Sequence, residues 1–175
     1  MSPAQAPGLE ILVAEPGADF ALVDSGHGRK LERCGPYRFI RPEPQAMWAP
    51  ADADWAADGE FVGGSDEEGG GRWRLSDAVP PAWAVSQAGV QLHAQCTPFR
   101  HLGFFPDMAP HWGQLAALPE GAEVLNLFGY TGVASLVAAA RGCRVVHVDA
   151  SKKAVEQARA NAQLSGLADR PIRWI

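Results

Sequence analysis

The 175-residue sequence has few cysteines, and the three that are present are far apart. Cys34, Cys96 and Cys143 include no C-x-x-C pair, so neither a structural zinc site nor a dithiol redox centre is expected. The five histidines also lack metal-ligand spacing, and we expect no metal. An odd number of widely spaced cysteines is typical of reduced thiols in a cytoplasmic protein.

The sequence also lacks long hydrophobic runs. The first residues, MSPAQAPGLE, have neither a basic start nor an apolar stretch, so they do not resemble a secretory signal. No segment approaches the roughly 20 apolar residues that are needed to cross a bilayer. We therefore expect a soluble cytoplasmic protein with no membrane partner.

Positive charge is not in excess, because 15 Lys and Arg face 20 Asp and Glu, giving a formal net charge of -5. Strong binding to nucleic acid through phosphates usually requires a basic surface. The composition therefore argues against tight RNA or DNA binding by the chain alone. Local basic strips remain at 29–33 (RKLER) and 38–41 (RFIR), although interleaved charges are more typical of a solvated strand face.

Short strands separated by turn residues dominate the first half of the sequence. They are predicted at residues 10–15, 19–24, 29–35, 37–42, 60–62, 72–76, 82–86 and 90–96. The strand at 60–62 lies within an acidic, glycine-rich stretch at 52–71, which we expect to be an exposed loop. This many strands in about 100 residues indicates a small antiparallel sheet or a partial barrel.

The pattern changes after Pro98. A helix is predicted over 107–118, with Asp107 as its N-cap, and strands and helices then alternate. The strands are expected at 122–127, 143–148 and 171–175, and the helices at 131–141 and 151–166. Alternation of this kind predicts a parallel, doubly wound sheet.

We therefore predict an α/β protein with two domains. Residues 1–98 form a small antiparallel β domain, and residues 99–175 form the first strands and helices of a doubly wound, Rossmann-like domain. Such sheets normally have five or more strands, so we expect the second domain to be incomplete at its C-terminus.

Two glycines mark the end of the first parallel strand, in the sequence FGYTG at 128–132. Ligands bind beyond the carboxyl ends of the strands in open parallel sheets, and Gly129 and Gly132 let the backbone approach a ligand closely. Asp149 follows the next strand, where a carboxylate can accept hydrogen bonds from both ribose hydroxyls of an adenosine. The turn and the carboxylate together predict a site for a cofactor that contains adenosine.

The choice of cofactor depends on a glycine that is missing. A dinucleotide site requires G-x-G-x-x-G, and Phe128-Gly129-Tyr130-Thr131-Gly132 has only two of its three glycines, with none before Gly129. S-adenosylmethionine has no phosphate and makes no such demand, and Asn126 offers a polar group nearby. A G-x-x-G turn also occurs without any ligand, and Ser151 is a good helix N-cap, so structural roles remain open for these residues.

The segments VLNLFGYTGVASLVAAARG (124–142) and VVHVDASKKAVEQARANAQLSGL (145–167) closely resemble motifs I and II of class I S-adenosylmethionine-dependent methyltransferases. In particular they resemble the bacterial family related to large-subunit ribosomal RNA cytosine-C5 methyltransferases. The resemblance extends to DFALVDSGHGRKLERCGPYRFIRPEPQAMW (19–48) and FRHLGFFPDMAPHW (99–112), and so covers nearly the whole chain.

The resemblance implies a cofactor site made of residues in and around the glycine turn. These are Asn126, Phe128, Gly129, Tyr130, Thr131 and Gly132 around the methionine part, Asp149 on the ribose, and Ala150 and Ser151 beside the adenosine. Phe104, Phe105, Pro106 and Asp107 would help to close the pocket. Met108 stands where the family often has glutamine, so a polar contact from that position is not expected.

The catalytic residues remain unknown. The family continues with a D-P-P-K-F-type motif beside the substrate base, and this motif does not occur before Ile175. A cytosine-C5 methyltransferase also needs a cysteine nucleophile, and none of the three cysteines stands in the family's catalytic position. We therefore expect the amino-terminal part of a methyltransferase that acts on ribosomal RNA. The alternatives are a non-catalytic RNA- or protein-binding module and, less favoured, an NAD-dependent oxidoreductase.

Overall fold

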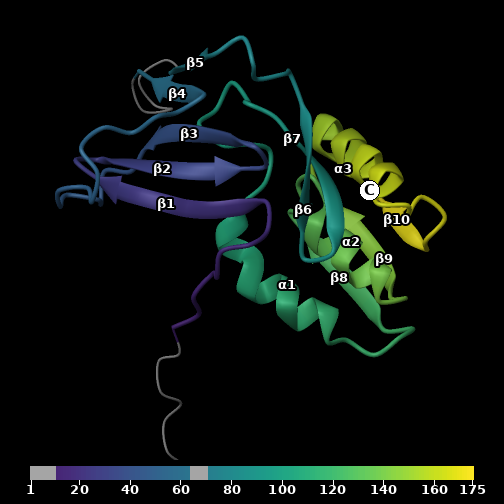
Figure 1. The fold of residues 1–175 in the computed structure, drawn as a ribbon. Coiled ribbons are helices and arrows are strands. Elements are labelled where there is room, and N and C mark those ends of the chain that lie inside the picture. The colour runs from purple at the N-terminus through teal and green to yellow at the C-terminus, as the bar shows by residue number, and fades with distance from the viewer. Residues whose placement is uncertain (1–10, 64–70) are drawn as a thin grey trace, which may run out of the picture.

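The computed structural model describes residues 11–63 and 71–175, and Figure 1 shows their arrangement. Seven strands come first, namely β1 (Phe20–Gly26), β2 (Arg29–Cys34), β3 (Tyr37–Pro42), β4 (Gly59–Val62), β5 (Arg72–Leu75), β6 (Trp83–Gln87) and β7 (Val90–Ala94). A 3-10 turn and alternating helices and strands follow, namely η2 (Pro106–Met108), α1 (Ala109–Ala116), β8 (Glu123–Leu127), α2 (Val133–Ala140), β9 (Arg144–Val148), α3 (Lys152–Leu164) and β10 (Ile172–Trp174). The predicted α/β class is confirmed.

The first five strands form one open sheet in the order β1-β2-β3-β4-β5. Three of its four pairings are antiparallel, as expected, but β3 and β4 run parallel, with Phe39 opposite Gly59. The parallel pairing arises because the chain between β3 and β4 returns to the starting end of β3 before it enters β4. The sequence predicted a small sheet or a partial barrel for these strands, and the structure has an open sheet.

Tight turns set the register of the hairpins. The turn between β1 and β2 has His27 at φ 49° and Gly28 at φ 74°, and the β6–β7 turn has Ala88 at φ 48° and Gly89 at φ 82°. Two positive φ values in a two-residue loop match the right-handed twist of the flanking strands. The predicted breaks at these positions are confirmed.

Two local predictions were wrong. Residues 11–15 were expected to be a strand, but they form none and expose Ile11 and Val13, because no neighbouring strand pairs with them. Asp107 was expected to cap a helix, but it lies inside η2, and α1 starts after Met108 with no side-chain cap. Proline at 106 and 110 favours two short helical pieces over one capped helix. Residue 10 of the first predicted strand and residues 64–70 of the predicted acidic loop lie outside the described residues.

The last three strands form a parallel sheet in the order β10-β9-β8. Helix α2 packs its buried face on β9, where Ala138 and Ala139 join Val145 in one cluster. Leu125 and Leu127 of β8 alternate with half-buried neighbours and lie exposed on the opposite face of the sheet. No helix in residues 11–63 and 71–175 is long and apolar enough to span a membrane.

The β6–β7 hairpin packs against α2 and α3, as Figure 1 shows. The backbone N–H of His93 donates to Asn161 Oδ1 at 2.9 Å, and the N–H of Gln91 donates to Ser165 Oγ at 2.9 Å. One hydrophobic cluster accordingly contains residues from both halves of the chain, including Phe39, Trp83, Leu92, Trp112, Leu136 and Ala162. The domain boundary at 98/99 stays a prediction, and the core runs across it.

Asp24 at the end of β1 anchors the loop that begins at residue 51. Its carboxylate accepts hydrogen bonds from the N–H groups of Asp52, Ala51 and Ser25 and from the Trp55 indole. These bonds lower the pKa of Asp24 from 3.8 to about 2, and the bond from the Asp52 N–H is the largest cause. A depressed folded-state pKa stabilises the loop above the unfolded pKa, and the stabilisation is lost as the pH falls through the folded value.

We predict that the Trp55 indole N–H resonance stays unchanged in NMR spectra from neutral pH to about pH 4 and shifts as the pH falls towards about 2. Asp24→Asn should remove this transition while leaving the resonances of Trp83 and Trp112 in place. A Trp55 resonance that titrates at the ordinary aspartate pKa would contradict the anchoring role.

Candidate functional site

The turn at 128–132 connects β8 to α2 with an unusual backbone. Phe128 has φ 56°, Tyr130 has φ 47° and Gly132 has φ 91°. Positive φ in residues other than glycine costs about 1–3 kcal/mol and persists only where the surroundings hold it in place. Here the Gly129 N–H donates to the Val148 carbonyl at 3.0 Å, which ties the turn to the end of β9. Strain of this kind clusters at functional sites.

Asp149 lies beside this turn, in the place where the sequence predicted a carboxylate. Its Oδ2 accepts a hydrogen bond from the Tyr130 N–H at 2.9 Å, and its Oδ1 accepts one from the Ser151 N–H at 2.9 Å. A carboxylate has about four acceptor sites, so each oxygen retains capacity for another donor. Asp149 therefore fixes the turn and the start of α3 and can still bind a ligand hydroxyl.

Gly129 and Gly132 are required by packing inside the protein. A Cβ on Gly129 would overlap the ring of His147, and a Cβ on Gly132 would lie 2.9 Å from the Cβ of Ala158 in α3. The sequence suggested that these glycines serve close approach to a ligand. The structure adds that they let β8, β9 and α3 converge beneath the turn.

A row of hydrogen-bonded polar side chains links β8, α2 and β9 next to the turn. Asn126 Nδ2 donates to Ser135 Oγ at 2.9 Å, and Ser135 Oγ lies 2.9 Å from His147 Nδ1. Burial lowers the pKa of His147, which favours the neutral ring. The amide nitrogen of Asn126 is therefore directed towards α2.

The segment at 101–105 lies next to the turn, as the resemblance implied. The Thr131 hydroxyl donates to the Gly103 carbonyl at 2.8 Å, and the Thr131 carbonyl accepts from Asn161 Nδ2 at 2.9 Å. The Tyr130 ring meets the rings of Phe105 and His101, with centroid separations of 5.3 and 5.6 Å. The side chain of Thr131 is thus committed to the protein, whereas Phe105 is partly exposed.

The other predicted cofactor residues differ in their accessibility. Phe128 is 90% exposed and Ala150 is exposed, while Phe104 is buried in the core. Ser151 is confirmed as the N-cap of α3, since its Oγ accepts from the Ala154 N–H at 3.2 Å.

The cysteines have no features of a nucleophile. Burial raises the pKa of both Cys34 and Cys96 to about 12, so these thiols stay neutral near pH 7. Cys143 is buried just before β9, with its Sγ directed at the Pro119 carbonyl. Within the described parts of the chain, no group of three His, Cys, Asp or Glu residues is arranged to hold a metal ion.

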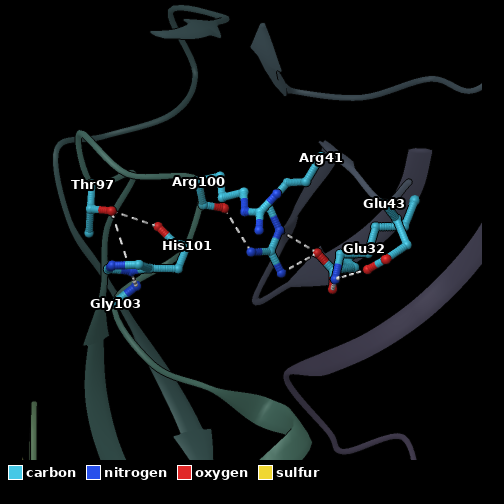
Figure 2. Close-up of polar contacts among 8 residues, drawn as sticks. Glu32, Arg41, Glu43, Thr97, Arg100, His101 and Gly103 are labelled. Atoms are coloured by element: carbon cyan, nitrogen blue, oxygen red, sulfur yellow. Dashed lines mark hydrogen bonds and ion pairs between the residues drawn. The ribbon is translucent and has the colours of Figure 1, made fainter. Parts of the chain in front are cut away.

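A buried ion pair near the turn was missed by sequence reasoning. Arg41 on β3 makes a charge-assisted bond of 2.6 Å to Glu32 on β2, and its Nη1 donates to the Arg100 carbonyl at 2.7 Å (Figure 2). Lys30 lies within ion-pair distance of Glu32 and Glu43. The hairpin at Gly35-Pro36 places these residues on one face of the sheet, a signal that the sequence contained. Their burial was not readable from it, because loop 97–103 covers them.

Comparison with known proteins gives these features a context. An S-adenosylmethionine-dependent methyltransferase from Agrobacterium tumefaciens has a solved structure with 49% sequence identity and a TM-score of 0.84, matching 91% of this chain and 52% of that protein. The methyltransferase resemblance is confirmed. The fold prediction is confirmed with it, because this match includes both the β sheet and the parallel sheet with its helices.

Two curated relatives match over shorter regions. Ribosomal RNA large subunit methyltransferase I from Erwinia tasmaniensis is 32% identical over 94 residues, which are 53% of this chain and 24% of that protein. Ribosomal RNA large subunit methyltransferase K/L from Pseudomonas syringae is 37% identical over 87 residues, which are 49% of this chain and 12% of that protein. The chain thus spans about half of the solved relative and a quarter or less of these curated ones. No family model matches the chain.

We predict that Gly129→Ala lowers the free energy of unfolding by about 1–3 kcal/mol, as expected for overpacking against the His147 ring. Urea denaturation measures this loss. Gly113→Ala in α1 is the matched control, because a Cβ there meets open space and should stabilise the helix slightly. Adding His147→Ala should recover part of the loss, and purely additive effects would contradict the proposed contact.

Proposed function

We propose that this chain supplies the cofactor-binding part of an S-adenosylmethionine-dependent methyltransferase. The observation that carries the proposal is the 49% identity to the Agrobacterium tumefaciens methyltransferase over 91% of the chain. The cofactor would supply an activated methyl group on a sulfonium. The contribution of this chain is to bind and orient that group.

The geometry of the turn fits such a ligand. The free acceptor capacity of Asp149 suits a pair of ribose hydroxyls, and its position is fixed by two backbone N–H groups. The exposed ring of Phe128 and the partly exposed ring of Phe105, which packs against Tyr130, offer apolar surface at the turn. We assign the remaining predicted contacts, at Ala150 and Ser151, to the adenosine. The backbone around Gly129 and Gly132 would meet the amino-acid part.

We propose that the substrate is RNA and, more specifically, ribosomal RNA. The support is that two curated relatives are named as ribosomal RNA large subunit methyltransferases. The cytoplasmic location expected from the sequence agrees with this proposal. The nucleophile and the methylated atom are not assigned to any residue of this chain.

We predict that the purified chain binds S-adenosylmethionine and not NAD in parallel calorimetric titrations. The turn has only two of the three glycines of the G-x-G-x-x-G pattern that NAD sites use. Heat with NAD alone would overturn the proposal.

We also predict that Asp149→Ala weakens S-adenosylmethionine binding by about 1–3 kcal/mol, because two ribose hydroxyls lose their acceptor. Asp169→Ala removes the same charge from an exposed site after α3 and should bind like the wild type. Circular dichroism and a thermal melt check that the variant is folded. Equal affinity in Asp149→Ala and the wild type would remove the ribose role.

A further inference from the structure

A cavity of about 960 Å³ lies between the β1–β3 face and the segment 99–109. None of the turn residues 128–132 lines it, but Phe104, Phe105, Pro106 and Asp107 of the predicted cofactor pocket do. This volume is at the upper end of the range for small-molecule sites. The cavity adjoins the turn, because His101 and Phe105 line it and both pack against Tyr130. What it binds follows from its walls, its charged side chains and a buried amide that has no hydrogen-bond partner among the described residues.

Aromatic rings form one wall of the cavity. Phe99 stacks on His101, with ring centroids 5.9 Å apart and an angle of 18° between the rings, yet Phe99 remains 57% exposed. A ring that is stacked on one side and accessible elsewhere can accept another flat π-system. Base–aromatic stacking of this kind is the common way in which proteins hold unpaired bases.

The charged groups in the cavity favour a neutral ligand. Lys30 and Arg41 are already paired with Glu32 and Glu43, so these four side chains have no net charge. Arg100, Glu15 and Asp107 also line the cavity, so acidic side chains exceed basic ones there by one. An anion such as a phosphate would be repelled inside, whereas a nucleobase would not.

Gln87 provides an unpaired donor at the cavity. It lines the cavity and is 7% exposed, and its Nε2 has no hydrogen-bond partner among the described residues. A buried amide without a partner is costly and rare, and it often marks a position that a ligand completes. A carbonyl oxygen or ring nitrogen of a base is the kind of acceptor that this amide lacks.

The loop that carries Phe99 is held in place before any ligand arrives. The Gly103 N–H donates to His101 Nδ1 at 3.2 Å, and Arg41 donates to the Arg100 carbonyl (Figure 2). The Thr97 hydroxyl also donates to the Phe99 carbonyl at 2.9 Å. These bonds use backbone carbonyls and the His101 ring, so the side chains of Phe99 and Arg100 remain available. Preorganisation of this kind reduces the entropy that binding would lose.

Arg100 lines the cavity and is also exposed to solvent, so it can contact a phosphate of a strand that continues outside. Its side chain is exposed, and within residues 11–63 and 71–175 its guanidinium makes no ion pair or hydrogen bond. It follows Phe99 directly, so one loop presents a ring for a base and a cation for the adjoining backbone. This pairing is the arrangement used to bind single-stranded nucleic acid.

We propose that the cavity receives one unpaired nucleobase of a single-stranded RNA. Phe99 stacks on the base, the Gln87 amide donates to it, and Arg100 contacts a neighbouring phosphate. That this strand is the one to be methylated rests on the function proposed above. The Arg41–Glu32 pair acts as a positioning device, because it sets the loop that carries Phe99.

Fluorescence anisotropy with labelled homopolymeric RNA strands of about six nucleotides tests the proposal on the intact chain. The wild type should bind single strands more tightly than a duplex of equal length. Phe99→Ala should weaken binding roughly five- to one-hundredfold, the range for loss of one stack, and Phe99→Trp should restore it. The substitution removes only the ring, since the loop bonds of Phe99 use its carbonyl.

Two further variants separate binding from structure. Gln87→Leu should weaken RNA binding by roughly fivefold while leaving thermal stability unchanged or raised, because it removes a buried donor without a partner. Arg100→Ala should reduce the slope of log affinity against log salt by about 0.7, the value for one phosphate on a single strand. Arg38→Ala removes an exposed arginine elsewhere on the sheet and should leave that slope unchanged.

Calorimetry with S-adenosylmethionine distinguishes failure of this inference from failure of the proposed function. We expect Phe99→Ala and Gln87→Leu to bind the cofactor as the wild type does, and saturating cofactor not to displace RNA. The inference alone would be overturned if the wild type bound the cofactor but no RNA strand. It would also be overturned if neither Phe99→Ala nor Gln87→Leu changed the affinity for RNA. Displacement of RNA by the cofactor would also overturn it. RNA binding that depends on Phe99 without any cofactor heat would support the cavity and overturn the cofactor proposal.

Discussion

The carboxylate of Asp149 is the interaction on which the site depends. It receives one N–H from the turn after β8 and another from the start of α3, so a single side chain holds together the ends of two parallel strands. The hydrogen bond from its N–H to Asp149 helps to hold Tyr130 at a positive φ. The position of Tyr130 in turn sets the contacts of its ring with His101 and Phe105, and these extend the same order into the segment before α1.

A second set of bonds joins this region to the β sheet. Thr131 binds the Gly103 carbonyl, and Arg41 binds the Arg100 carbonyl, so the loop between β7 and η2 is held from both of its sides. Asn161 of α3 bonds to the Thr131 carbonyl and to the backbone of β7. The sheet, the loop and the parallel strands therefore form one connected unit. A ligand at the turn and a ligand in the cavity would each meet parts of it that are already ordered.

The charge distribution bears on how an acidic chain could bind the RNA substrate that we propose. Lys30 and Arg41, which line the cavity, are paired with Glu32 and Glu43, and Arg100, Glu15 and Asp107 complete its charged lining. Positive charge available for phosphates lies at exposed positions such as Arg100. A protein of this kind would recognise a strand chiefly through its bases, and tight non-specific binding through phosphates is not expected at a net charge of -5.

The sequence by itself determined the class of the fold, the turn at 128–132 and the carboxylate that faces it. These features can be read along the chain. Strands and helices alternate, the tight hairpin turns take two residues each, and Asp149 comes directly after the strand that follows the Gly129 turn and its helix. The strand expected at 11–15 failed because strand formation needs a partner, which propensity does not provide. Only the tertiary structure decided that Gly129 makes room for His147 and that Lys30, Glu32 and Arg41 face a cavity. Both depend on contacts between segments far apart in the chain, and burial by a distant segment leaves no periodic signal in the residues that it covers.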